Sequence, residues 1–187
     1  MEDKEKRILE SAQKFFFRYG FKKTSLDEIA EDAGVAKGTI YNYFKNKEDL
    51  FICNAESKQL EIKQAMEKEL VQFKKADEKL IHSTLFIILH HIKLIKEYAM
   101  SKAVLEELVF VGMNLLGKAP EHTERIMAFL QEGVAQGIFK TGDHEKNAAL
   151  INQTMKLFFV HWASMDSQAA ETEIRDLFEL IFNGLKC

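Results

Sequence analysis

Residues that interrupt helices are scarce along this chain. Its 187 residues include one proline, Pro120, and nine glycines. Elsewhere apolar side chains recur at intervals of three and four, the spacing that places them on one face of an α-helix. Because a β-rich fold needs many turns, which glycine and proline supply, the sequence predicts an all-α protein. A hydrophobic content of 47% is enough to build a buried core.

Residues 24–44 have the spacing of two short helices joined by a sharp turn. Ser25 and Glu28 form a capping-box pattern, which predicts a helix start. Gly34 is suited to the left-handed conformation that ends such a helix. A second helix then follows, with Ile40 as its buried anchor. An ordinary helical hairpin has this spacing too, and so does a helix-turn-helix that binds DNA.

The exposed side of the second helix carries groups that suit DNA. If Ile40 and Phe44 face inward, the side chains left outside are donors, a small residue and an aromatic: Lys37, Gly38, Thr39, Tyr41 and Asn42. The flanking segments 11–26 and 33–47 contain basic residues and no acid. This segregation of charge favours a basic surface that faces an anionic backbone.

The first fifty residues resemble the amino-terminal domain of TetR (tetracycline repressor) family transcriptional regulators. The residues that carry the resemblance are Tyr19-Gly20-Phe21, Thr24-Ser25, the block from Gly34 to Phe44, and Lys45 to Leu50. It implies a helix-turn-helix DNA-binding domain at 1–47 and a larger helical effector-binding and dimerisation domain at 48–187. Ala36 departs from the pattern, because many members have a serine or threonine there that caps the second helix.

The resemblance and the charge pattern together predict how the protein contacts double-stranded DNA. We expect base edges and adjacent phosphates to be approached by Lys37, Gly38, Thr39 and Tyr41. We expect the DNA backbone to be held by Thr24, Ser25, Asn42, Tyr43 and Lys47. Lys47 lies at a helix start, where free N–H groups also favour a phosphate.

The rest of the chain is divided by predicted breaks near residues 75–77, 98–102, 117–120 and 137–142. The last two helices have wide apolar stripes, which either pack on their own core or form a four-helix homodimer interface. A twofold dimer suits a palindromic operator. The expected interface residues are Leu150, Ile151, Thr154, Leu157, His161, Ile174, Leu177, Phe178, Ile181 and Phe182.

The middle helices combine bulky apolar side chains with isolated polar ones, which is typical of a small-molecule site. The same spacing is also common in an ordinary core. The expected pocket residues, for a small and largely apolar effector, are Phe86, His90, Phe110, Met113, Asn114, Phe129, Phe158 and Trp162.

Other classes of protein find little support. Two cysteines, Cys53 and Cys187, are too few for a disulfide framework and suit a reducing cytoplasm. The apolar stretch 80–95 is too short and too polar to span a membrane. We expect no metal, no cofactor and no enzyme activity, because neither metal-ligand spacing nor a nucleophile motif occurs. The predicted function is that of a homodimeric transcriptional repressor whose affinity for operator DNA is modulated by a small, largely apolar ligand. The alternatives are an activator and a helical adaptor that does not bind DNA.

Overall fold

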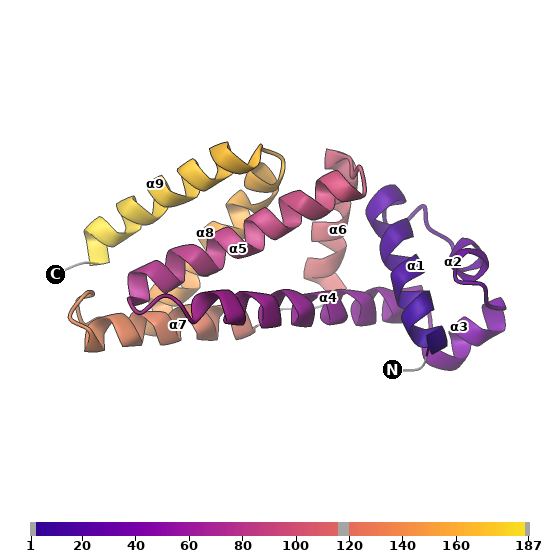
Figure 1. Cartoon of the computed structure of the whole chain (residues 1–187), viewed down its shortest axis with the longest axis horizontal. Coiled ribbons are helices and arrows are strands. Elements are labelled where there is room, and N and C mark those ends of the chain that lie inside the picture. Colours follow the sequence, from indigo (N-terminus) through magenta and orange to yellow (C-terminus); the bar gives the residue numbers. More distant parts are fainter. Residues whose placement is uncertain (1–2, 116–119, 186–187) are drawn as a thin grey trace. The chain divides into compact units, whose positions relative to one another are not determined.

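The computed structural model describes residues 3–115 and 120–185, and in these ranges the chain forms helices and no β-strand (Figure 1). The helices are α1 (Asp3–Tyr19), α2 (Leu26–Asp32), α3 (Lys37–Tyr43), α4 (Lys47–Leu70), α5 (Ala76–Glu97), α6 (Lys102–Leu115), α7 (Pro120–Ala135), α8 (His144–Ala163) and α9 (Ser167–Leu185). The all-α prediction is confirmed. The predicted break at 117–120 and Cys187 lie outside the described residues.

The helices belong to two compact units. The first unit comprises residues 1–61 and 94–118, and the second comprises residues 62–93 and 119–187. Residue 47, the predicted end of the DNA-binding domain, lies inside the first unit. That unit therefore includes the start of α4 and all of α6 in addition to the three N-terminal helices.

Aromatic side chains of α1 pack in the core of the first unit. Phe16 is fully buried, and its ring centroid lies 5.7 Å from that of Phe21 and 5.4 Å from that of Phe51. Ile29 of α2 and Ile40 of α3 are buried in the same cluster. Both helices of the motif are therefore held through their apolar faces, which leaves their polar faces outside.

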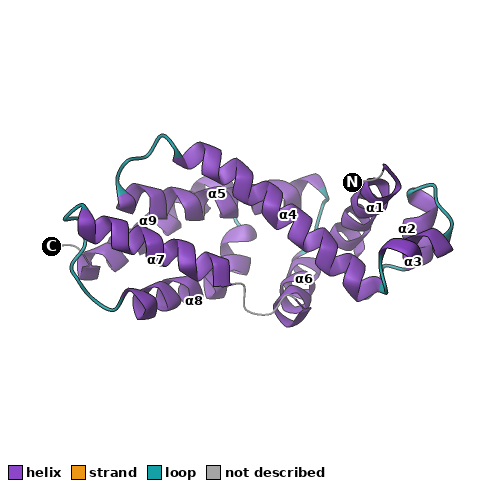
Figure 2. Ribbon diagram, turned by 90° about the horizontal axis from the view of Figure 1, so that it is seen from below, coloured by secondary structure: helices purple, strands orange, loops and turns teal. Residues whose placement is uncertain are grey.

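The second unit buries apolar faces of α5, α7, α8 and α9 in one core. Figure 2 shows α7 and α8 side by side, and Asn152 Nδ2 of α8 donates to Thr123 Oγ1 of α7 at 2.8 Å. The turn after α7 folds Phe139 back over Gly133, where an added Cβ would lie 2.1 Å from the ring. Glycine is thus required at 133 for this close approach.

Candidate functional site

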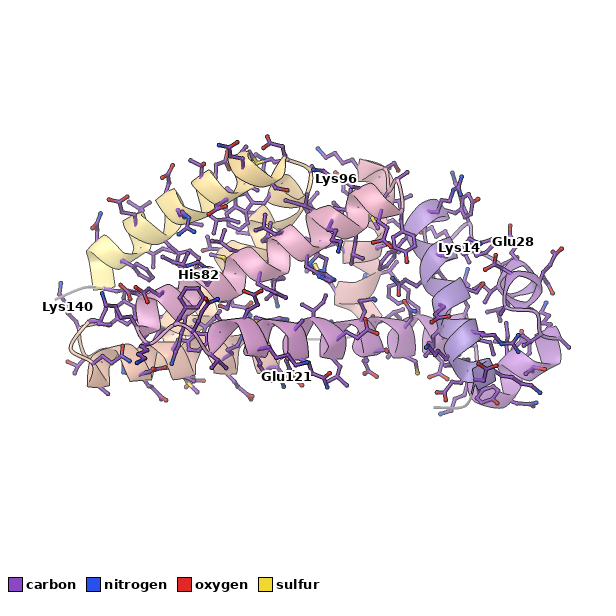
Figure 3. All side chains as sticks on the ribbon, in the orientation of Figure 1. Lys14, Glu28, His82, Lys96, Glu121 and Lys140 are labelled. Atoms are coloured by element: carbon purple, nitrogen blue, oxygen red, sulfur yellow. The ribbon has the colours of Figure 1, made fainter. Side chains whose placement is uncertain are left out.

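The start and the end of α2 are fixed by short-range interactions. Ser25 Oγ accepts the Glu28 backbone N–H at 3.2 Å, and Glu28 Oε2 accepts the Ser25 backbone N–H at 2.9 Å. The predicted capping box is therefore present, and Glu28 is labelled in Figure 3. Gly34 follows the helix with φ of +63°, the left-handed conformation that glycine adopts most readily.

Two faces of α3 differ sharply in their surroundings. Ile40 is fully buried, whereas Tyr41 is 51% exposed. Lys37, Gly38 and Asn42 are exposed as well, and Thr39 is half-buried. The polar face of this helix therefore points to solvent, as a helix that enters the major groove requires.

The N-terminus of α3 lacks a side-chain cap. Ala36 occupies the capping position and makes no side-chain hydrogen bond, as its methyl group dictates. At Gly38 an added Cβ would meet nothing within 4 Å. Nothing inside the chain requires glycine at this position, which leaves the backbone of α3 open to a close external approach.

An ion pair links the two helices of the motif on their exposed side. Lys37 Nζ lies 2.8 Å from Asp27 Oδ2, and both side chains are largely exposed. The hydrogen bond to Asp27 raises the pKa of Lys37, so the lysine carries its full charge. In the free protein the charge of Lys37 is therefore paired with the carboxylate of Asp27 on α2.

Lys47 joins the start of α4 to the loop between α1 and α2. Its Nζ donates to the carbonyl oxygens of Phe21 at 2.9 Å and Thr24 at 3.1 Å, and lies 4.5 Å from the centroid of the Phe21 ring. Two of its three N–H donors are thus used within the protein. Lys47 has a structural role in this loop in addition to the predicted role on phosphate.

The structure gives Thr24 a different role from the one expected. Its side chain is buried, and its Oγ1 donates to the Gly20 carbonyl at 2.7 Å. A hydroxyl in this position shapes the loop and is not exposed to solvent. The half-buried Ser25 hydroxyl is likewise engaged in the capping box, and Tyr43 is half-buried beside Phe44.

Three further lysines on the surface of the first unit were not among the expected DNA contacts. Lys22, Lys23 and Lys45 are exposed and form no ion pair with another described residue. By contrast, Lys14 is paired with Asp32. Lys22, Lys23 and Lys45 belong to the two segments that contain no acidic residue, and this was the signal in the sequence that pointed to them. Cations without an ion-pair partner are available to phosphates.

The second unit contains a cavity of about 400 Å³ between the end of α4, α5 and the start of α9. Its lining is apolar with a charged rim: Glu69, Leu70, Phe73, His82, Leu85, Phe86, Leu89, His90, Lys93, Glu171 and Arg175. His82, labelled in Figure 3, stacks on Phe73 with 3.9 Å between ring centroids. Burial, followed by the charge of Arg175, lowers the pKa of His82.

The eight expected pocket residues divide between the two units. Phe86 and His90 line the cavity, whereas Phe110, Met113 and Asn114 are exposed on α6 in the first unit. The remaining three lie elsewhere in the second unit, where Phe129 is half-buried, Phe158 is exposed and Trp162 is in the core. Spacing on α6 identified an apolar face without showing that the face is open to solvent.

The expected interface residues divide between core and surface. The buried members belong to the core of their own unit: Ile151, Ile174, Phe178 and Phe182. Thr154, Leu177 and Ile181 are half-buried, and Leu150, Leu157 and His161 are exposed. Leu157 is 81% exposed, and Leu180, which was not among the expected residues, is 71% exposed. Exposed apolar side chains therefore remain on α8 and on α9, fewer than the stripes suggested.

A polar group at the start of α7 was missed in the sequence. Arg125 Nη2 donates to His122 Nδ1 at 2.7 Å, and both side chains are half-buried. Their spacing of three places them on one face of the helix, close to the positions of Ile126 and Phe129. Cationic residues beside an inward-facing apolar stripe were the available signal.

Residues 3–115 and 120–185 contain no candidate metal site and no candidate membrane-spanning helix. No three His, Cys, Asp or Glu side chains gather there as ligands for a metal ion. None of the helices in these ranges combines the length and hydropathy needed to cross a membrane.

Comparison with known proteins identifies the class. Residues 8–52 match the family of bacterial regulatory proteins named tetR. The chain is also 30% identical to the uncharacterised HTH-type transcriptional regulator YhgD of Bacillus subtilis, an alignment that covers 98% of this chain and 97% of YhgD. The chain therefore belongs to the TetR family of DNA-binding transcriptional regulators.

Three further similarities concern regulators of fatty acid metabolism. The fatty acid metabolism regulator protein of Bacillus subtilis is 29% identical over 96% of this chain and 94% of its own length. The structure of FadR from Bacillus halodurans, a fatty acid degradation regulator, superposes with a TM-score of 0.76 at 23% identity, over 95% of each chain. FadR from Bacillus subtilis in complex with stearoyl-CoA gives 0.74 at 24% identity, over 96% of this chain and 98% of FadR.

Proposed function

We propose that this protein is a homodimeric repressor that binds a palindromic operator through α3 and releases it when a small, largely apolar effector binds the second unit. The observation that carries the DNA-binding part is the division of α3 into a buried face, with Ile40, and an exposed face, with Lys37 and Tyr41. One short helix covers only a few base pairs, so two copies are needed to specify an operator. Such a regulator acts in the cytoplasm, where the bacterial chromosome lies.

The exposed apolar side chains of α8 and α9 support the dimer. Leu150, Leu157 and Leu180 are each more than half exposed, and exposed large apolar side chains on two terminal helices favour a protein partner there. A second copy of this chain buries these side chains by twofold symmetry, as a four-helix interface.

The effector belongs to the second unit. The cavity lined by Phe86 and His90 supports a ligand there, and two similar proteins are described as fatty acid regulators. We therefore propose a long-chain acyl compound, with acyl-CoA as the first candidate because FadR of Bacillus subtilis was solved with stearoyl-CoA. The effector acts by binding the arrangement that is incompetent for DNA more tightly than the competent one.

Selection of bound fragments from random duplex DNA tests this function directly. The purified full chain is expected to enrich a palindromic sequence, and palmitoyl-CoA is expected to lower its affinity for that sequence. A Tyr41→Ala variant, altered on the exposed face of α3, should enrich little or nothing. The adaptor alternative predicts no enrichment with the wild-type chain, and an activator predicts tighter binding with palmitoyl-CoA.

A further inference from the structure

The first two turns of α7 carry a half-buried arginine without a carboxylate partner in the described ranges. Arg125 makes its one described hydrogen bond to His122 Nδ1, and no ion pair of the described residues includes it. Glu121, labelled in Figure 3 on the same helix, is paired instead with Lys63, with 3.5 Å between Nζ and Oε2. The guanidinium of Arg125 is therefore partly buried, and no carboxylate of the described residues forms an ion pair with it.

A guanidinium in such a position favours an anion. Burial lowers the pKa of Arg125, whereas Glu121 and Glu67 raise it without bonding to it. An arginine nevertheless stays protonated, and a half-buried charge to which no carboxylate of the described residues is bonded costs free energy. Its five N–H donors form a planar fork that matches carboxylate or phosphate oxygens. One of these donors is used by His122, so the others are available to an anion.

The surrounding groups add donors and positive charge. Because the guanidinium can only donate, His122 accepts at Nδ1 and carries its proton at Nε2. Burial, followed by the charges of Arg125 and Lys156, lowers the pKa of His122 to about 4, so this ring is neutral near pH 7. Lys156 of α8 forms no ion pair with the described residues. From α5, His91 donates Nδ1–H to the Ile87 carbonyl at 2.7 Å, and burial lowers its pKa.

Aromatic side chains lie on the same face of α7 as Arg125 and against His91 of α5. Phe129 follows Arg125 by one helical turn, on the same face of α7. Phe159 of α8 contacts His91 edge to face, with 4.9 Å between ring centroids. A cationic group flanked by aromatic rings suits a molecule with a charged head and an apolar body.

We propose that Arg125, His122 and Lys156 bind the anionic group, a carboxylate or a phosphate, of an amphiphilic effector whose apolar part packs beside Phe129 and Phe159. This inference rests on the proposed ligand-binding function and adds the charge of the effector and its anchoring residues, none of which lines the cavity of Phe86 and His90. Arg175 at the rim of the cavity is the competing anchor. Its Nε and Nη2 both bond to Glu171 Oε1, at 2.9 and 2.7 Å, so its charge already has a partner.

Calorimetric titration of the full chain with three probes tests this inference. Palmitate supplies a carboxylate, palmitoyl-CoA supplies phosphates, and hexadecanol supplies a similar chain without charge. Arg125→Gln is expected to weaken binding of at least one anionic probe by roughly 10- to 100-fold, the range of charge-assisted hydrogen bonds, and to leave hexadecanol unchanged. Arg125→Lys should lose less, because it keeps the charge and loses the fork. The probe that is weakened identifies the anionic group.

Lys140→Gln, which removes one exposed positive charge of the second unit outside the cavity lining, is the control, and operator affinity of each variant reports whether it is folded. The control should bind all three probes within about threefold of wild type. Equal losses for hexadecanol and the anions, or a loss with Arg175→Gln and none with Arg125→Gln, would overturn the inference while leaving an effector in place. If the wild-type chain binds none of the probes, the proposed acyl effector itself fails, and the inference fails with it.

Discussion

Helices α3 and α7 place their polar side chains in opposite ways. On α3, Lys37 and Tyr41 face solvent while Ile40 anchors the helix in the core. On α7, His122 and Arg125 are half-buried, within reach of charges on α8 and α5. The α3 surface follows from one helix and its flanking turn, whereas the α7 group depends on the packing of three helices. A function on a locally specified surface can therefore be predicted from a motif, and an interior one cannot.

The largest effect is expected from Ile40→Ala. This side chain is fully buried, so its truncation should cost about 2–5 kcal/mol of unfolding free energy and displace α3. Urea unfolding and operator titration measure both effects, and palmitoyl-CoA binding by the second unit should persist. Leu60→Ala, at a site 54% exposed in the same unit, should change stability by no more than about 0.5 kcal/mol. An Ile40→Ala protein that still binds its operator would break the comparison.

The second-largest effect is expected to be a dependence of stability on pH that arises from His122 of α7. The pKa of His122 is about 4 in the folded protein, below its ordinary value of 6.5, so the unfolded chain binds the proton more tightly. Stability is therefore full above pH 6.5 and falls as the pH drops toward 4, by at most about 3 kcal/mol. His122→Gln should flatten this part of the curve. Parallel urea-unfolding curves for the two proteins between pH 7 and pH 4.5 would contradict the assignment.

The predictable part of the molecule is the part whose partners lie close in sequence. Ser25 and Glu28 are three residues apart, and Gly34 ends the helix that they begin, so their roles followed from known local geometry. Thr24 was predicted to contact DNA because the sequence shows that it carries a hydroxyl group. The sequence does not show that this side chain is buried. Its partner Gly20 lies only four residues away, but a threonine at a helix start fits either role.

The apolar stripes of the later helices show the limits of periodicity. Phe178 and Phe110 both fall on apolar stripes, yet Phe178 is fully buried and Phe110 is 66% exposed. Spacing tells which side chains share a face, but the packing of other helices decides whether that face is covered. Arg125 was missed for the same reason, since its burial arises from neighbours far along the chain.

The third prediction separates the structural and DNA-binding roles of Lys47. Lys47→Met removes the hydrogen bonds to the carbonyls of Phe21 and Thr24, which should cost about 1–3 kcal/mol of unfolding free energy. If its remaining donor binds a phosphate, the slope of log affinity against log salt should also fall by about one unit. Lys45→Met is the matched control, because Lys45 is exposed and should change the slope without changing stability. An unchanged slope with Lys47→Met would leave it a structural role alone.

The smallest effect is expected at Gly38. Gly38→Ala should stabilise the protein by about 0.5–1 kcal/mol, because alanine favours helix and its methyl group meets nothing in the chain. Operator affinity should nevertheless fall, since the added methyl group lies on the surface proposed to approach DNA. Gly184→Ala in α9, where an added Cβ also meets nothing, should leave operator affinity unchanged. Tighter operator binding by Gly38→Ala would show that α3 does not approach DNA at this point.

The Asp27–Lys37 pair has a consequence for how a regulator of this kind searches a chromosome. Before Lys37 can contact a guanine, it has to leave a carboxylate that lies 2.8 Å away, so every encounter begins with the same loss. A correct site offsets that loss with acceptors placed for the lysine, whereas an arbitrary sequence does not. If Lys37 contacts bases as proposed, Asp27 shortens the time spent on wrong sequences and leaves more molecules free to find the right one.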